Sequence, residues 1–119
     1  MTVVLWLLQV LLAVIFAASG SAKLVMSKDR MIASGQTGVA PFPLPLIRVT
    51  AGAEVVAALG LVLPAATGVA VVLTPLAALG LMIVMVGAAA SHASLREYPQ
   101  VGLNLVLLVL ALVVLLGRS

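Results

Sequence analysis

One carboxylate stands out among the residues of this chain that could do chemistry. Glu54 lies near the middle of an apolar run from Leu44 to Leu63, and no other apolar run of this length contains an acidic residue. Half of a hydrocarbon core of roughly 30 Å would separate it from water by about 15 Å on either side. A charged side chain at that depth costs at least ~2.5–3.5 kcal/mol, so we expect Glu54 to be neutral or paired.

Other polar residues gather where the apolar runs begin and end. They lie on one side of the membrane, from which a long side chain could reach Glu54. Lys23 ends the first run and Arg48 lies one turn into the second, so either long side chain could extend inward to Glu54. A threonine precedes Glu54 by four residues and shares its helix face. We therefore predict a candidate intramembrane polar network that comprises Lys23, Arg48, Thr50, Glu54, His92 and Asn104.

Each member of this network also has a plainer interpretation. Lys23 and Arg48 could be anchors whose charged heads extend to the membrane surface. His92 and Asn104 could make only interfacial or interhelical hydrogen bonds. A lone histidine without cysteines or further carboxylates is a poor metal site, so no metal is expected. For Glu54, a structural ion pair and a proton-handling or ligand-binding role both stay open.

The elements that must position these residues are membrane-spanning helices. The chain has 119 residues, of which 65% are hydrophobic and 8% charged, and its mean hydropathy is +1.39. A soluble domain of this size has too little interior to bury so much apolar surface. Four stretches can cross a bilayer as helices, at about 3–24, 44–63, 67–90 and 101–117. We predict an all-α polytopic membrane four-helix bundle that forms one domain over residues 1–119.

The first connection, roughly residues 25–43, is the longest one. Ser27 is expected to cap a short interfacial helix, after which a Gly- and Pro-rich stretch keeps the chain extended. The segment is either a simple tether across the mouth of the bundle or a lid over a cavity between the helices. Phe42 is the residue that such a lid would insert.

Prolines are expected to shape the third helix and the turn before it. The second connection is expected at Pro64–Ala66, which carries no charge. Pro75 is expected to kink the third helix because it removes a backbone hydrogen bond. Thr74 could then bond the carbonyl that is left free.

The distribution of charge predicts orientation and excludes some partners. The net charge is +3, and five of the six Lys and Arg residues flank the first and third connections, which share one side of a four-span bundle. The positive-inside rule places that side in the cytoplasm and both termini outside, in an integral protein of the bacterial plasma membrane. Anionic lipid headgroups explain the positive charge, so nucleic acid is not expected as a partner. The first run lacks the basic start of a signal peptide and is expected to remain as a helix.

Several segments occur in an order that is typical of one family. These segments are Phe16–Leu24, Pro45–Glu54, Ala58–Pro64, Pro75–Leu81 and Gly87–His92. With them the chain resembles the DoxX-like family of small four-helix membrane proteins over essentially its whole length. In that resemblance the diagnostic features fall on Lys23 and on Gly52 with Glu54.

The resemblance implies that the protein is a subunit of a membrane complex or assists the assembly of one. The family takes its name from a membrane subunit of a thiosulfate:quinone oxidoreductase. Other members look like components of oxidoreductase or detoxification complexes, and a distant vertebrate branch looks like a chaperone for nicotinic receptors. This chain has no cysteine, and it shows no flavin, haem or iron–sulfur ligand set of its own.

Two functions follow. The favoured one is a small accessory protein without catalytic activity alone, which binds a membrane partner or a lipophilic small molecule through a bundle cavity that contains Glu54. The alternative is a membrane subunit of a quinone-linked oxidoreductase complex, in which a quinone is bound and Glu54 handles protons. A homo-oligomer is compatible with both. Transport is less favoured, because four short helices need at least a dimer to build a pathway.

Overall fold

Helices make up nearly all of the computed structural model, which describes residues 2–118. The four long helices are α1 (Thr2–Val25), α3 (Leu44–Thr67), α4 (Leu73–Ser94) and α5 (Tyr98–Arg118), and the first connection holds the short helix α2 (Lys28–Ala33) and the 3₁₀ turn η1 (Thr37–Val39). Each long helix is long and apolar enough to cross a membrane. The predicted all-α membrane four-helix bundle, with a short helix after the first span, is confirmed.

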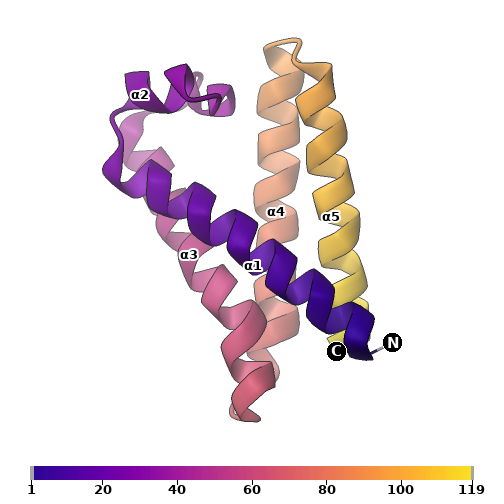
Figure 1. Cartoon of the computed structure of the whole chain (residues 1–119). Helices are drawn as coiled ribbons and strands as arrows, with labels where there is room; N and C mark the ends of the chain where they lie inside the picture. Colours follow the sequence, from indigo (N-terminus) through magenta and orange to yellow (C-terminus); the bar gives the residue numbers. More distant parts are fainter. Residues whose placement is uncertain (1, 119) are drawn as a thin grey trace.

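The four long helices form two antiparallel pairs. α1 packs along α3 and α4 packs along α5, while contacts of α3 with α4 and of α1 with α5 join the pairs into a ring. Figure 1 shows that α1 and α3 lean away from α4 and α5 toward the end that carries α2. We call this end the strap end. The N- and C-termini lie together at the opposite, terminal end (Figure 1).

The two pairs are held together mainly in the half of the bundle next to the terminal end. Fully buried residues there come from all four long helices: Leu12, Leu61, Leu81, Ala111 and Val114. Gly60 of α3 allows close contact with α4, because a Cβ at this position would lie 3.0 Å from the Cβ of Ala77. The strap half contains fewer of these contacts, which leaves space between the pairs.

The prolines act differently from the sequence-based prediction. α3 continues through Pro64 to Thr67 and ends at Gly68, whose φ of 71° is left-handed. The second connection therefore lies at residues 68–72, and the prediction of Pro64–Ala66 is wrong. Pro75 lies in the first turn of α4, where backbone N–H groups have no helical partner, so the predicted kink has no cause there.

Pro64, inside α3, is the proline that frees a backbone carbonyl, an effect that was predicted for Pro75. Pro64 has no N–H, so the carbonyl of Gly60 lacks its usual helical donor. The hydroxyl of Thr74 in α4 donates to this carbonyl at 3.0 Å. Thr74 thus bonds a freed carbonyl, as predicted, but the carbonyl belongs to the neighbouring helix and the bond joins the two helix pairs.

The first connection folds over the strap end. Ser27 caps α2 as predicted, and its hydroxyl oxygen accepts a hydrogen bond from the Arg30 N–H. We call residues 34–43, which follow α2 and include η1, the strap. A small core of Met31, Val39 and Ile47 fixes the strap to α2 and α3, and Lys28 Nζ donates to the Phe42 carbonyl at 2.6 Å.

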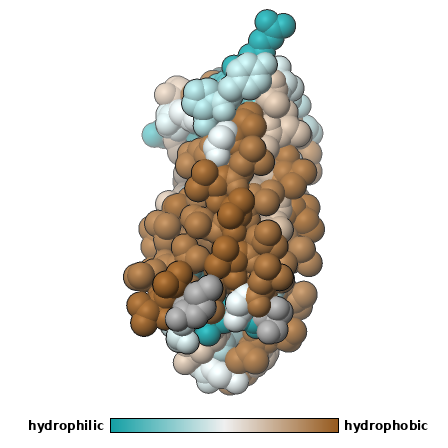
Figure 2. Space-filling view, turned by 90° about the vertical axis from the view of Figure 1, so that its right-hand side faces the viewer, coloured by the Kyte–Doolittle hydropathy of each residue, from teal (hydrophilic) through white to brown (hydrophobic). Residues whose placement is uncertain are grey.

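The surface matches a bilayer. On the face shown in Figure 2, a broad hydrophobic band covers the middle of the molecule and hydrophilic residues gather toward its ends. Many large apolar side chains are exposed on the long helices, for example Val3, Val49, Val56 and Leu116. These residues face lipid, because exposure of this extent in water would be unfavourable.

Candidate functional site

A cavity separates the two helix pairs in the strap half of the bundle. Its volume is about 550 Å³, all four long helices contribute to its walls, and the strap closes it with residues that include Gln36 and Phe42. Most of the lining side chains are apolar, with a few polar groups among them. Small-molecule sites in proteins typically have this volume and this composition.

The cavity is continuous with the lipid-facing surface. Leu46, Ile83 and Leu103 line it, and they are 47%, 68% and 59% exposed, respectively. All three belong to helices that are long enough to cross the membrane. The cavity therefore borders the apolar outer surface of the bundle.

Glu54 lies in the cavity wall and is paired with Lys23. Lys23 Nζ lies 3.2 Å from Oε1 and 3.5 Å from Oε2 of the carboxylate. The Glu54 side chain is 1% exposed and that of Lys23 is 19% exposed. The acid expected at the middle of the membrane thus has a cationic partner on the neighbouring helix.

A glycine explains why these two side chains meet. A Cβ on Gly20 of α1 would lie 2.7 Å from the carbonyl oxygen of Ala51 in α3, so any larger residue would push the helices apart. Lys23 follows Gly20 by three residues and lies on the same helix face. The close helix crossing at Gly20 therefore brings the ammonium group to Glu54.

Arg48 has another partner. Its guanidinium donates to the carbonyl oxygens of Leu24 and, at 3.2 Å, of Met26. These carbonyls lie at the end of α1, where helical donors are missing. Arg48 therefore binds the end of α1, and the structure does not bring it to Glu54.

Two amide side chains in the cavity wall have unused hydrogen-bonding capacity. Asn104 is 8% exposed, and its Nδ2 has no hydrogen-bond partner among the described residues. The buried Oε1 of Gln36 in the strap likewise lacks one within residues 2–118. Both residues line the cavity, as does Thr50. A buried polar group without a partner costs roughly 1–3 kcal/mol, so a ligand or water that satisfied these atoms would be stabilising.

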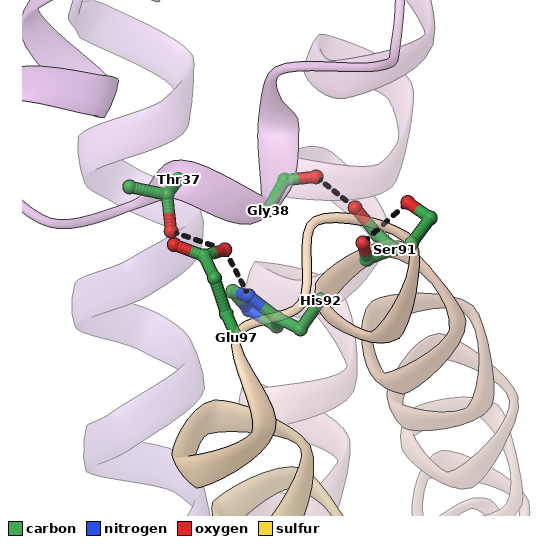
Figure 3. Close-up of polar contacts among 6 residues, drawn as sticks. Thr37, Gly38, Ser91, His92 and Glu97 are labelled. Atoms are coloured by element: carbon green, nitrogen blue, oxygen red, sulfur yellow. Dashed lines mark hydrogen bonds and ion pairs between the residues drawn. The ribbon is translucent and has the colours of Figure 1, made fainter.

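His92 takes part in a second polar cluster, at the edge of the cavity. Figure 3 shows Thr37 and Gly38 of the strap facing Ser91, His92 and Glu97. Thr37 Oγ1 donates to Glu97 Oε1 at 2.8 Å, and His92 Nδ1 lies 3.0 Å from the same oxygen. Ser91 Oγ donates to the Gly38 carbonyl at 2.5 Å. We call these five residues the latch, because they fasten the strap to the C-terminal end of α4.

The latch depends on charge and on close packing. The hydrogen bond from Thr37, followed by the one with His92, holds the pKa of the Glu97 carboxyl below its usual value of 4.5. Gly38 lies against the imidazole, since a Cβ on it would be 2.8 Å from His92 Nε2. The latch therefore favours an ionised Glu97 and a glycine at position 38.

Sequence reasoning missed four of the five latch residues. It named His92, but Thr37, Gly38, Ser91 and Glu97 lie in or beside connections, where their partners cannot be inferred from helix periodicity. Thr37 and Glu97 are separated by 60 residues. The one available signal was the presence of an acidic residue five positions after the single histidine.

A third polar cluster lies at the terminal end and has a structural role. Gln9 is fully buried; its Nε2 donates to the Leu61 carbonyl at 2.6 Å, and its Oε1 accepts from Arg118 Nε at 2.7 Å. The Arg118 guanidinium also lies 5.3 Å from the centre of the Trp6 ring. These contacts join α1, α3 and α5 far from the cavity.

The site thus offers an apolar space, one neutralised ion pair and two free amide groups. Among the described residues there is no group of three or more His, Cys, Asp and Glu side chains that could hold a metal ion. The chemistry that the arrangement supports directly is binding: hydrocarbon against the apolar walls and a polar head against the amides.

Fold and site together define a class, that of small four-helix integral membrane proteins, here with a cavity in one half of the bundle. The model of the DoxX-like family matches residues 7–114, and the chain belongs to this family. No curated protein and no solved structure matches this chain.

Proposed function

We propose that this protein is a membrane accessory protein that binds a lipophilic small molecule in the cavity between its helix pairs. The molecule enters from the bilayer, lays its hydrocarbon along the apolar walls and directs its polar group toward the Lys23–Glu54 pair and the free amides. No step of this function requires catalysis by the chain itself. A partner membrane protein that delivers or uses the molecule is compatible with it.

The observation that carries the proposal is the combination of the cavity with its exposed apolar rim. A bundle of four helices without a ligand would gain packing energy if its pairs closed on each other. Here the cavity of about 550 Å³ is walled by residues that also face lipid, including Ile83 and Leu103. A space of this kind suits a molecule that partitions into membranes.

A glycine in the cavity wall provides the test. Gly87 lines the cavity, and a Cβ on it would meet no described atom within 4 Å. Gly87 is itself exposed, at the edge of the cavity, so we expect Gly87→Phe to place its ring across the cavity opening without disturbing the backbone. In the wild-type protein, a bound lipophile present at 100 times its Kd should add about 2.7 kcal/mol of stability. The variant should lose this gain, as measured by thermal denaturation with a panel of long-chain alcohols, alkanes and quinones.

Gly102→Phe is the matched control. Gly102 is exposed on α5, and a Cβ on it likewise has no described atom within 4 Å. Both variants replace an exposed helical glycine with the same residue, but only Gly87 lines the cavity. Equal ligand responses in the two variants would rule out the cavity as the binding site. A response to quinones alone would favour the quinone-linked alternative.

A further inference from the structure

We propose that the cavity selects uncharged lipophiles whose head group both accepts and donates a hydrogen bond, with a primary amide or an alcohol as the simplest forms. This inference rests on the proposed function and specifies the head group that the site takes. It is carried by the hydrogen-bonding state of the polar atoms in the cavity wall.

Asn104 supplies the free donor. Its side chain is more than nine-tenths buried, it lines the cavity, and its Nδ2 has no partner in the part of the chain that the structure describes. An amide whose role was to hydrogen-bond two helices to each other would use this nitrogen to donate to a neighbouring helix. Since it does not, a head group with an acceptor oxygen would satisfy it.

Gln36 supplies the free acceptor. It belongs to the strap and lines the same cavity, and its buried Oε1 likewise lacks a donor within residues 2–118. A head group that only accepts hydrogen bonds would leave this oxygen unsatisfied. A primary amide or a hydroxyl carries both functions: an oxygen that can accept from Asn104 and an N–H or O–H that can donate to Gln36.

The charged side chains of the cavity disfavour a charged head group. Lys23 and Glu54 neutralise each other at 3.2 Å, and His92 contacts Glu97 at 3.0 Å. A carboxylate head would meet the Glu54 carboxylate beside its cation, and an ammonium head would meet Lys23 beside its anion. Either charge would be desolvated without a free countercharge, which is unfavourable in an apolar cavity.

The test compares head groups on one hydrocarbon chain. The intact protein in lipid nanodiscs is titrated with a long-chain primary amide, its N,N-dimethyl form, and the alcohol, carboxylate, amine and alkane of the same chain length. We expect the primary amide and the alcohol to bind about tenfold more tightly than the carboxylate, the amine and the alkane, because each hydrogen bond satisfies a buried group. The N,N-dimethyl amide, which cannot donate to Gln36, should also bind more weakly.

Two variants locate the selectivity. Asn104→Leu should reduce the preference for the amide over the alkane to less than about threefold while alkane binding persists. The same variant should raise the Tm of the ligand-free protein, because it removes an unsatisfied buried donor. Gln36→Leu should abolish the difference between the primary and the dimethylated amide.

The outcomes separate this inference from the proposed function. If no molecule of the series binds, the proposed function fails and the inference fails with it. If all bind alike, or if a charged head binds most tightly, the proposed function stands and the head-group inference is overturned. It is also overturned if Asn104→Leu lowers the Tm of the free protein and leaves the head-group preference unchanged. The titration of the wild-type protein remains decisive if a variant does not fold.

Discussion

At the scale of single residues, the Lys23–Glu54 pair is asymmetric. Glu54 is 1% exposed and lies deep in α3, whereas Lys23 is 19% exposed and lies near the end of α1. A lysine in this position can withdraw its ammonium group to the membrane surface if its partner is lost. Glu54 has no such route. The two partners therefore contribute differently to stability when removed one at a time.

This asymmetry predicts that Lys23→Met is more destabilising than Glu54→Gln. Lys23→Met leaves a buried carboxyl without its cation and should cost about 3–5 kcal/mol, the range for breaking a buried pair. Glu54→Gln leaves a lysine that can reach water, and the amide oxygen of the new glutamine still accepts a hydrogen bond. The cost should therefore be about 1–2 kcal/mol. The measurement is the free energy of unfolding in mixed micelles.

The double variant Lys23→Met with Glu54→Leu is the control. Because it removes both charges and retains apolar volume, it should be more stable than Lys23→Met alone. A double variant that is less stable than Lys23→Met would show that the carboxyl is stabilised by something other than Lys23.

Part of this site could be predicted from residue types alone. The depth of Glu54 follows from counting along an apolar run, and Lys23 and Arg48 were both within reach of it. The selection of Lys23 depends on the crossing at Gly20 and on the carbonyls at the end of α1 that occupy Arg48. The free state of Asn104 Nδ2 depends on which atoms of other helices approach it, and no sequence pattern encodes that.

At the scale of elements, we expect the strap and its latch to respond to pH. The carboxylate of Glu97 accepts from Thr37, and its only other described partner is His92 of α4. The connection holding Glu97 lies outside the membrane-spanning helices, between α4 and α5. We therefore expect the charge of Glu97 to help hold the strap over the cavity.

The lowered pKa of Glu97 predicts the direction of this pH dependence. A carboxyl whose pKa is lower in the folded state stabilises that state above its usual value of 4.5 and ceases to do so as pH falls through the lowered pKa. Hydrogen-exchange protection of the strap amides, corrected for intrinsic rates, should therefore hold at neutral pH and decrease only as the pH falls below 4.5.

Glu97→Gln serves as the comparison. It retains an acceptor oxygen but not the charge, so strap protection should be weaker at neutral pH and should no longer change in the acidic range. If the variant loses protection over the same acidic range as the wild type, Glu97 is not the group that titrates.

The helices themselves were the most predictable elements, since long apolar runs leave few alternatives in a membrane. Their ends were less so. Pro64 suggests a turn, but the hydroxyl of Thr74 satisfies the carbonyl that this proline frees, and the helix continues to Thr67. A rule about proline applies to one helix at a time, and it cannot include a donor from the next one.

At the scale of the whole molecule, the two ends differ in charge. Five of the six Lys and Arg residues lie at the strap end or in the connections there: Lys23, Lys28, Arg30, Arg48 and Arg96. Arg118 lies at the terminal end and is engaged by Gln9 and Trp6. We infer from the positive-inside rule that the strap end lies in the cytoplasm and both termini lie outside.

Single cysteines test this orientation, because the native chain has none. Ala33→Cys places a thiol at the strap end, and Ala66→Cys places one at the terminal end; both positions are exposed. In intact bacterial cells, a membrane-impermeant maleimide should label Ala66→Cys at once and Ala33→Cys only after the membrane is permeabilised. The reverse pattern would invert the orientation without affecting the fold.

The close contact of α3 with α4 at Gly60 gives the bundle a mechanical property. About 20 Å of helix separates Gly60 from Leu46 at the rim of the cavity, at 1.5 Å per residue, so a tilt of about 3° at the glycine moves the rim by about 1 Å. The width of the opening therefore depends on helix tilt at a contact that does not line the cavity. Because bilayer thickness acts on helix tilt, we expect it to change how tightly the proposed ligand binds.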